Sequence, residues 1–306
     1  LEDRHRNIAA SLQKVTEEVL LAIARHVQEQ TGLTRLCLAG GSFLNCPTNT
    51  RILNETAFDE VYVQPAAGDA GGALGAAVAV AQGLRGEPRG TVMERAFLGP
   101  EFSDRELRAA LTSHDARFER MEDDQLFPFV AGQVAQGSIV GWFQGRMEFG
   151  PRALGARTIL ADPRNPDMKD LLNSKVKHRE SFRPYGVSVL AEEAHRWFDC
   201  GDRESPFMLF TYRALPDKVG AIPSAVHVGR TSRIQTVTRR EERYYAVIAA
   251  FRDLTGVPMM INTSFNDNTE PIVCTPGDAY RCFANTHMDY LVMGNYVARK
   301  ADSREG

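Results

Sequence analysis

Apolar residues near the N-terminus recur at the spacing of one face of an α-helix. Between residues 7 and 30 they lie three or four positions apart, which predicts an amphipathic helix. The apolar positions are Ile8, Leu12, Val15, Val19, Ile23 and Val27. Thr31-Gly32 is expected to end this helix, because glycine commonly follows the last helical residue.

Short apolar runs and helical patterns alternate over residues 33–82. Strands are predicted at Leu36–Leu38 and Val61–Val63, with a helix from about Asn45 to Leu53 between them. A helix rich in alanine and glycine follows within 64–82. This alternation is typical of α/β architecture, in which ligands bind at loops that follow the carboxyl ends of strands.

The chain divides into two predicted domains. Residues 83–95 are rich in Gly, Pro and Arg, which is typical of a linker, and we assign domains to 1–85 and 99–306 with a linker at 86–98. The later domain is also predicted to be α/β. Its expected helices are 104–113 (with Ser103 as a cap), 124–136, 166–176, 241–254 and 276–285, and its expected strands are 138–143, 185–190, 207–212 and 290–293.

Composition narrows the functional classes. The 306 residues are 43% hydrophobic and 25% charged, with a formal net charge of -3, which is ordinary for a globular enzyme and argues against a general nucleic-acid binder. Any anion site must therefore be a local cluster. No apolar run reaches the roughly 18 residues that span a bilayer. The five cysteines form no C-x-x-C pair, which favours free thiols in a reducing cytoplasm.

The densest candidate site is residues 146–183. This segment holds nine basic residues against five acidic ones, in a chain that is acidic as a whole. The basic residues are Arg146, Arg152, Arg157, Arg164, Lys169, Lys175, Lys177, Arg179 and Arg183. Charge runs usually lie on solvated surfaces. Here the arginines alternate with apolar and rigid residues such as Phe149, Pro151 and Phe182, which favours a partly desolvated anion site with bidentate contacts.

A glycine-rich turn follows the second predicted strand. Gly68 and Gly71 allow a phosphate to approach the backbone, and Asp69 could hold a metal that bridges phosphates. Close packing of a glycine-rich helix on a sheet would account for the same residues. The pattern is neither a G-x-G-x-x-G fingerprint nor a Walker loop.

A similar turn follows the first predicted strand. Gly40 and Gly41 are expected to face phosphate, and Asn45 either binds a ligand or caps the next helix. The two turns support each other because both follow a strand and precede a helix.

Neutral polar residues gather at the end of a later strand, within residues 260–273. Asn262, Thr263, Ser264 and Asn266 could bind a phosphate, a ribose or an amide, or could bond to their own turn. In a second polar stretch, 225–237, arginines stand at a strand start beside His227, which is expected to be structural. No Ser-His-Asp pattern, Cys-His pattern or complete metal-ligand set is recognisable, so positioned cations acting on phosphates are favoured over a covalent mechanism.

Several segments, in this order, resemble one protein family. GRMEFGPRALGARTILADPR (145–164), KHRESFRPYGVSVL (177–190), TSRIQTV (231–237) and INTSFN with EPIV (261–273) are similar to the C-terminal YrdC-like domain of the NodU/tobramycin O-carbamoyltransferase family. AGGSFLNC and GDAGGALGAA, within 39–77, resemble the second half of that family's actin/hexokinase-like (ASKHA) domain. The resemblance implies an α/β fold with a partial ASKHA domain followed by a YrdC-like domain built on a twisted sheet.

The resemblance also implies a two-step reaction. The YrdC-like domain would convert carbamoyl phosphate and ATP into carbamoyl-adenylate, with loss of phosphate and pyrophosphate. The ASKHA domain would then transfer the carbamoyl group to a hydroxyl of a small-molecule acceptor, often a natural product such as an antibiotic. ATP and Mg²⁺ are expected, as is Fe²⁺ in a transfer site whose other ligands lie in a half-domain absent from this chain.

Site residues follow from the same resemblance. Arg152, Lys177, Arg183 and Arg233 match the basic residues that bind carbamoyl phosphate and nucleotide, and these are the expected catalytic set. Fixed cations of this kind would offset the repulsion between two anionic substrates. The other expected binding residues are Arg146, Ser264 and Asn266 in that pocket, Asp69 at the metal, and Gly40, Gly41, Asn45, Gly68 and Gly71 in the glycine turns.

Two loops depart from the family's pattern. HVGRTSR stands where HVDGTAR is usual, so Gly229 replaces an acidic residue and Arg230 is added. Thr269 stands where a glycine commonly precedes the glutamate. Both changes are compatible with altered nucleotide contacts or with neutral drift.

Other functions share these features. A tRNA threonylcarbamoylation enzyme would have both folds, although it would need a basic RNA-facing surface. Because the charged opening LEDRHRNIAAS enters a helical pattern at once, we expect the chain to begin inside a domain. It would then be a nucleotide-binding regulator, or a subunit that works with a polypeptide carrying the other half-domain, or a homodimer. The sequence does not specify the acceptor.

Overall fold

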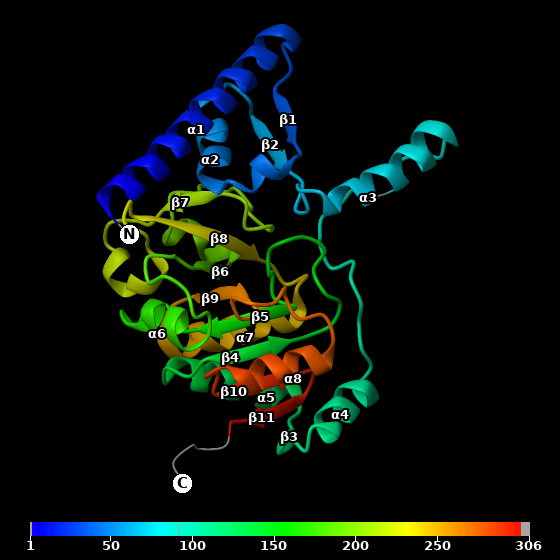
Figure 1. The fold of residues 1–306 in the computed structure, drawn as a ribbon, viewed down its shortest axis with the longest axis vertical. Coiled ribbons are helices and arrows are strands. Elements are labelled where there is room, and N and C mark those ends of the chain that lie inside the picture. The colour runs from blue at the N-terminus through cyan, green and yellow to red at the C-terminus, as the bar shows by residue number, and fades with distance from the viewer. Residues whose placement is uncertain (1, 91, 301–306) are drawn as a thin grey trace. The chain divides into compact units, whose positions relative to one another are not determined.

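The computed structural model describes residues 2–90 and 92–300 (Figure 1). It separates into two compact units, residues 1–93 with 209–211 and residues 94–208 with 212–306. The division at Met93 falls within the segment 86–98 that was expected to be a linker. Thr91 of that segment, and the chain ends at 1 and 301–306, lie outside the described residues. None of the described helices is both long and apolar enough to cross a membrane.

The first unit is a small α/β assembly. Its elements are α1 (Asp3–Thr31), β1 (Arg35–Leu38), α2 (Cys46–Glu55), β2 (Glu60–Val63) and α3 (Ala70–Val78), with a 3-10 turn at Gly41–Leu44 and a π-helical segment at Ala79–Leu84. β1 and β2 pair in parallel, so α2 is the crossover of a β-α-β unit. The predicted order of helices and strands is therefore correct here.

Two local signals set the helix boundaries in this unit. Gly32, directly after α1, has φ 64°, in the left-handed region that glycine adopts without strain. Asn45 precedes α2, and its side chain accepts a hydrogen bond from the backbone N–H of Thr48 at 3.3 Å. The structure therefore shows the capping role of Asn45 that was one of its two expected roles.

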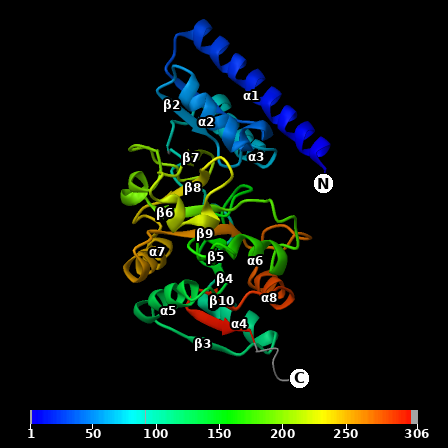
Figure 2. The same ribbon diagram turned by 90° about the vertical axis from the view of Figure 1, so that its left-hand side faces the viewer.

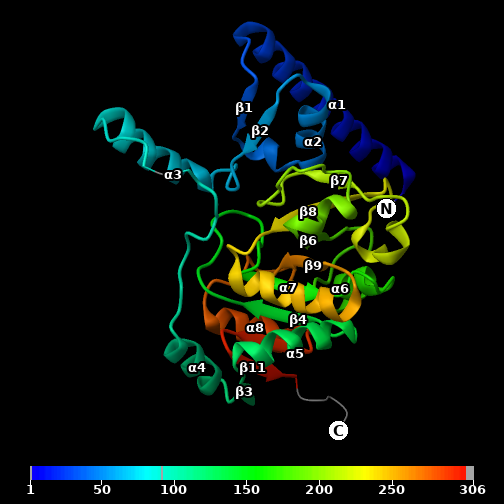
Figure 3. The ribbon, with the colours of Figure 1, turned by 180° about the vertical axis from the view of Figure 1, so that it is seen from behind.

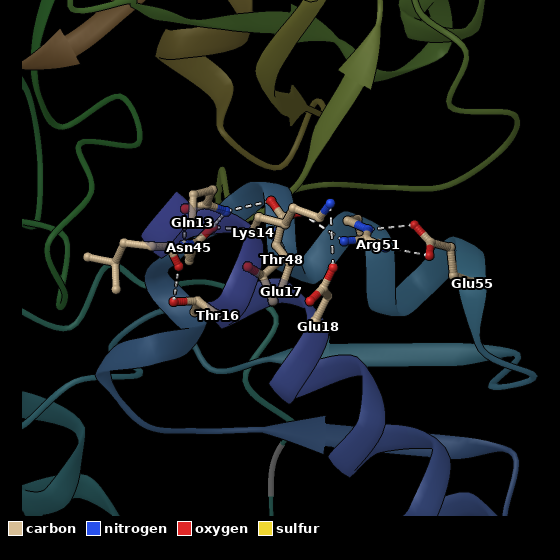
Figure 4. A network of polar contacts seen from close by, with 10 residues as sticks. Gln13, Lys14, Thr16, Glu17, Glu18, Asn45, Thr48, Arg51 and Glu55 are labelled. Atoms are coloured by element: carbon tan, nitrogen blue, oxygen red, sulfur yellow. Dashed lines mark hydrogen bonds and ion pairs between the residues drawn. The ribbon is translucent and has the colours of Figure 1, made fainter. Parts of the chain in front are cut away.

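Polar side chains link α1 to α2 (Figure 4). Gln13 and Asn45 exchange side-chain hydrogen bonds at 3.1 and 2.8 Å. The Arg51 guanidinium donates to both carboxylate oxygens of Glu55, at 2.6 and 2.8 Å, and to Glu17 at 2.9 Å. These hydrogen bonds with the two carboxylates raise the pKa of Arg51. The side of α1 that meets α2 is thus largely polar.

The apolar stripe that predicted α1 lies on a different side of that helix. Its side chains are between 38% and 67% exposed, and they are Ile8, Leu12, Val15, Val19, Ile23 and Val27. Among the described residues of α1, those that are buried are Leu21 and Ala24. The helix was predicted correctly, but its hydrophobic face is left on the surface, where contiguous apolar residues usually mark an interaction site.

The second unit is built on one mixed sheet. Its strands are β3 (Phe118–Arg120), β4 (Val140–Phe143), β5 (Arg157–Ala161), β6 (Gly186–Leu190), β7 (Thr211–Arg213), β8 (Thr231–Val237), β9 (Met259–Ser264), β10 (Tyr290–Met293) and β11 (Tyr296–Arg299). Their order across the sheet is β3-β11-β10-β4-β5-β9-β6-β8-β7. β4 pairs with β10 and β6 with β8 in parallel, whereas β5 and β9 pair with their neighbours in antiparallel fashion.

Helices cover both faces of this sheet. They are α4 (Asp104–Ser113), α5 (Asp123–Ala135), α6 (Met168–Lys175), α7 (Glu242–Thr255) and α8 (Pro276–Asn285). α5 and α7 lie on one face, and α6 and α8 lie on the other (Figures 2 and 3). Strands buried on both sides need apolar residues at successive positions. Accordingly β4, β5 and β6 are buried throughout, with Trp142, Ile159 and Val187 in the core.

Helices were predicted better than strands in this unit. α4 and α8 have the expected bounds, α4 with the predicted Ser103 cap, and α5, α6 and α7 begin and end within two residues of expectation. The strand expected at 207–212 is wrong in its first part, because β7 begins only at Thr211. Met208 has φ 58°, which no strand residue adopts, so the apolar run there is a buried loop.

A substitution at Gly155 would test how tightly the loop before β5 packs on α7. It has φ 112°, and a Cβ added there would lie 2.3 Å from the Tyr244 ring. We expect Gly155→Ala to lower the free energy of unfolding by about 3 kcal/mol, from overpacking together with backbone strain. Gly145→Ala is the matched control, since Gly145 also has positive φ (47°) but open space, and should cost about 1 kcal/mol. Equal shifts of the urea midpoint for the two variants would contradict this packing.

Candidate active site

The candidate site is a cavity of about 280 Å³ in the second unit. It lies at the end of the sheet where β5, β6 and β8 begin and β9 ends, because the antiparallel register sets Ser264 beside Thr158 and Asn262 beside Gly186. Its lining residues are Pro151, Arg152, Ala153, Arg179, Arg183, Pro184, Tyr185, Met208, Arg233, Asn262, Thr263 and Ser264.

Four arginines give this cavity its electrostatic character. Arg152 comes from the loop before β5, Arg179 and Arg183 from the loop before β6, and Arg233 from β8. No carboxylate is present among the described lining residues. Several guanidinium groups facing one partly enclosed space suit a ligand with more than one phosphate or carboxylate group.

Glu148 holds the loop that carries Arg152. This carboxylate is buried, and one of its oxygens accepts hydrogen bonds from the backbone N–H groups of Leu154 and Ala156, both at 2.7 Å, and of Arg157 at 3.2 Å. The loop therefore folds around one negative charge supplied by its own side chain. Three backbone donors on a single carboxylate oxygen make a rigid turn, because each bond is charge-assisted.

Arg157 supports the same loop from the start of β5. Its side chain is 0% exposed and donates to the carbonyl oxygens of Gln144 at 2.9 Å and Pro100 at 3.3 Å. The guanidinium also lies 3.5 Å from the centre of the Phe143 ring. Burial lowers the pKa of Arg157 to about 10, partly offset by the nearby Glu148 charge. Although Arg157 belongs to the basic run, it is a structural residue and does not line the cavity.

A polar network under the cavity fixes the other side of this loop. Asn262 donates to the carbonyl oxygen of Ala153 at 3.0 Å, and Gln235 donates to that of Leu154 at 2.8 Å. Asn262 also donates to Ser188 and Gln235, and these residues are almost fully buried. Buried polar side chains are costly unless bonded, so such a network strongly specifies one geometry. Asn262, for which ligand binding and bonding within its own turn were both left open, lines the cavity and bonds to the loop that carries Arg152.

Lys177 lies beside the cavity and does not line it. Its side chain is 2% exposed, and its ammonium donates to the carbonyl oxygens of Ser264 and Asn266, the latter at 2.7 Å, and to Asn266 Oδ1 at 2.8 Å. Ser264 is a lining residue of the cavity, and its hydroxyl oxygen is 3.4 Å from Lys177 Nζ. Burial, together with the charge of Arg179, lowers the pKa of Lys177 to about 7.

The cavity thus brings together part of the expected set. Arg152, Arg183, Arg233 and Ser264 line it, while Lys177 and Asn266 lie directly behind Ser264. Arg146 is outside the lining, and its guanidinium lies 3.4 Å from the carbonyl oxygen of Leu98. Ligand binding by any of these residues stays a prediction.

Sequence reasoning left Arg179, Tyr185 and Met208 out of the expected site. Arg179 had a usable signal, because it belongs to the same basic run and lies two residues from Lys177. Tyr185 and Met208 belong to apolar stretches, and such stretches give no sign that a side chain faces a ligand cavity.

The loops that depart from the family's pattern have local structural roles. Arg230 has φ 57° and closes a turn by donating from its backbone N–H to the carbonyl oxygen of His227. Thr269 bonds through its backbone and hydroxyl to Asp267. His227 contacts the Tyr185 carbonyl oxygen at 3.1 Å, and burial lowers the pKa of its imidazole. This surrounding fits the structural role expected for His227.

The glycine turns of the first unit lie next to each other. The backbone N–H of Gly40 donates to the carbonyl oxygen of Ala67 at 2.7 Å. A Cβ at Gly71 would lie 2.1 Å from the carbonyl oxygen of Ala66, so packing alone requires glycine there. Binding of phosphate by Gly40, Gly41 and Gly68 is a prediction that these contacts leave open.

Asp69 is the residue expected at a metal. It lies on the surface at the start of α3, and its side chain makes no capping bond. In the part of the chain that the structure describes, no three His, Cys, Asp or Glu side chains converge as a metal site would require. The residues present therefore do not by themselves fit the implied iron.

Comparisons with known proteins identify the family of this chain. The family model described as carbamoyltransferase C-terminus matches residues 131–300, more than half of the chain, and the model described as carbamoyltransferase N-terminus matches residues 1–78. Protein sll1178 of Synechocystis sp. is 45% identical over 98% of this chain and 53% of its own length. Nodulation protein NolO of Bradyrhizobium diazoefficiens is 42% identical over 97% of this chain and 55% of its own.

Two further facts bear on these matches. The chain spans about half the length of the curated relatives. Among solved structures, full-length HypF in its phosphate- and nucleotide-bound form aligns with 58% of this chain and 22% of its own at 15% identity and a TM-score of 0.38, a likeness too weak to support any conclusion.

The family models cover both units and include every residue that lines the cavity. The chain therefore belongs to the carbamoyltransferase family.

Proposed function

We propose that this chain is the adenylate-forming part of an ATP-dependent O-carbamoyltransferase. The observation that carries the proposal is the cavity in which Arg152, Arg179, Arg183 and Arg233 meet the polar end of β9. Carbamoyl phosphate and ATP are both polyanions, and bringing them together requires fixed positive charge in a partly desolvated space. Family membership supplies the carbamoyl chemistry, and the cavity supplies the anion site.

The proposed first step forms carbamoyl-adenylate. Water replaces the phosphate of carbamoyl phosphate, giving carbamate and inorganic phosphate. A carbamate oxygen then attacks the α-phosphorus of ATP, and the bond from that phosphorus to the oxygen of the β-phosphate breaks. Pyrophosphate leaves, one water is consumed, and no atom changes oxidation state. The arginines would stabilise charge that moves onto the leaving pyrophosphate.

We propose separate roles for the groups around β9. Ser264 would meet substrate, because it lines the cavity, and its hydroxyl donates to Asn266 Oδ1 at 2.6 Å. Lys177 would act through this pair, holding both residues from behind. Mg²⁺ would enter with ATP and bridge its phosphates. The second unit corresponds in this proposal to the YrdC-like domain and the first unit to part of an ASKHA domain.

Transfer to an acceptor would involve residues beyond this chain. In the proposal the acceptor is a small molecule with a hydroxyl group, such as a natural product, and Asp69 contributes one ligand to an iron whose remaining ligands lie elsewhere. Because the residues present do not form a metal site, we derive no step through that metal. The proposed setting is the cytoplasm.

Removing one cavity arginine should slow the first step. Arg152→Gln and Arg183→Gln should each lower kcat/KM for pyrophosphate release from carbamoyl phosphate plus ATP by at least about tenfold, because each deletes a charge-assisted contact to phosphate. Arg240→Gln is the control, since Arg240 lies outside the cavity and pairs with Glu94. Release that is equally fast in all three variants would reject the assignment of this cavity.

The pKa of Lys177 gives the site a pH signature. In the free protein this pKa is lowered to about 7, so much of the amine is unprotonated at pH 8. A bound polyanion favours the ammonium form, so pyrophosphate binding should take up protons at pH 8 and weaken as the pH rises above 7. Calorimetry in buffers of different ionisation enthalpy measures this uptake. It should vanish in Lys177→Met; uptake that persists there would assign the proton to another group.

Measuring phosphate and pyrophosphate release also separates an enzyme from a regulator that only binds nucleotide. A regulator would bind ATP without releasing phosphate or pyrophosphate in the presence of carbamoyl phosphate. An enzyme that lacks only its transfer half would release both, and would carbamoylate an acceptor once the missing half is supplied. Absence of release by the chain with saturating substrates and Mg²⁺ would favour the regulator.

A further inference from the structure

Asn173 lies next to the cavity without lining it. It is on α6, and its side chain is 1% exposed. A primary amide offers two N–H donors and two acceptor positions on its oxygen. A fully buried amide must have these bonded within the protein, so its partners show which part of the fold it serves.

All four positions of the Asn173 amide are used by one loop. Its Nδ2 donates to the carbonyl oxygens of Ser181 at 3.3 Å and Arg183 at 3.1 Å. Its Oδ1 accepts from Arg179 Nε at 2.9 Å and from the Tyr185 hydroxyl at 2.7 Å. The backbone carbonyl oxygen of Asn173 accepts a fifth bond, from the N–H of Arg179 at 3.0 Å.

Three residues of the cavity wall are among these partners. Arg179, Arg183 and Tyr185 all line the cavity, and each is bonded to Asn173 by side chain or backbone. The Arg179 guanidinium also lies 4.8 Å from the centre of the Tyr185 ring. Arg179 is therefore held between an amide oxygen and an aromatic ring, which leaves its orientation little freedom.

We call the hydrogen bonds from Asn173 to this loop the tether. The loop needs them for two physical reasons. Residues 176–185 form neither helix nor strand, so no backbone ladder fixes them. Within them His178 has φ 45°, a left-handed conformation that costs a residue other than glycine about 1 kcal/mol. Two arginines on the loop also line the same cavity as two more, which gathers four like charges around one space, and of the loop arginines Arg183 has an ion pair with Glu180 at 3.1 Å.

We propose that Asn173 is a positioning residue for the polyanion site, which acts by holding Arg179 and Arg183 in place before the ligand binds. The inference rests on the proposed function only in identifying the natural ligand as carbamoyl phosphate or ATP. Fixing charged groups in advance lowers the ordering cost of binding, so Asn173 contributes to affinity through residues that it holds.

Aspartate is the informative substitution. Asn173→Asp keeps an acceptor oxygen for Arg179 and Tyr185 and nearly the same shape, but it replaces the amide nitrogen that donates to Ser181 and Arg183 by a second oxygen. It also sets a carboxylate against two carbonyl oxygens and beside the Arg179 guanidinium, whose charge it would offset. We expect pyrophosphate, used as the probe, to bind Asn173→Asp at least about tenfold more weakly than it binds the unmodified protein.

A double-mutant cycle separates positioning from general loss of structure. If Asn173 acts through Arg179, Asn173→Asp should weaken pyrophosphate binding much less in an Arg179→Gln background than in the unmodified protein. Asn295→Ala is the control for loss of an asparagine that bonds a backbone carbonyl oxygen, because Asn295 donates to Met121 and Asp123 outside the cavity. It should lower the melting temperature without changing pyrophosphate affinity.

The outcomes are distinct. Unchanged pyrophosphate affinity in Asn173→Asp, or full additivity with Arg179→Gln, would overturn the role of Asn173 and leave the proposed function standing. If the unmodified protein failed to bind pyrophosphate, the proposed function would fall. Limited trypsin digestion would then still test the tether, since cleavage after Arg179 should be faster in Asn173→Asp than in Asn295→Ala. Equal cleavage would refute the tether itself.

Discussion

The geometry of the cavity depends on one carboxylate that the chain folds around. Glu148 accepts hydrogen bonds from three successive parts of its own loop, at Leu154, Ala156 and Arg157, and it is buried while doing so. A buried charge is costly unless a compensating charge is near, and the buried Arg157 provides that charge. The resulting loop is the one that places Arg152 in the cavity. The Asn262 network holds the same loop from below, so side chains from β5, β8 and β9 converge on it.

Much of this architecture was readable because helical spacing and caps are local signals. α4 and α8 were placed to the residue, since Ser103 and Thr275 start them with capping boxes and the apolar spacing carries them to their ends. The strands β3, β5 and β11 were missed. The three residues of β3 are too few for a pattern, and β5 begins with Arg157 and Thr158, so it was taken as part of the basic run.

The sequence was less informative about which way a side chain points. The basic run 146–183 predicted an anion site, and its members separate on folding: Arg157 and Lys177 are buried, while Arg152, Arg179 and Arg183 line the cavity. Charge alone does not tell which basic side chains become buried and which line the cavity. Burial depends on carbonyl oxygens supplied by distant segments, such as that of Ser264 for Lys177. The stripe on α1 shows the opposite case, in which apolar residues predicted a helix but not the side on which it packs.

Burial of Lys177 bears on unwanted side reactions at the site. An amine whose pKa is about 7 is a good nucleophile at neutral pH, and a cavity for an activated carbamoyl donor would place an electrophile close to it. Reaction between them would convert Lys177 into a neutral urea and inactivate the protein. Nζ donates to three oxygens of Ser264 and Asn266, which uses the three N–H bonds of the ammonium form and leaves no lone pair for attack in that state. The fold can therefore keep a reactive amine beside such a donor without self-modification.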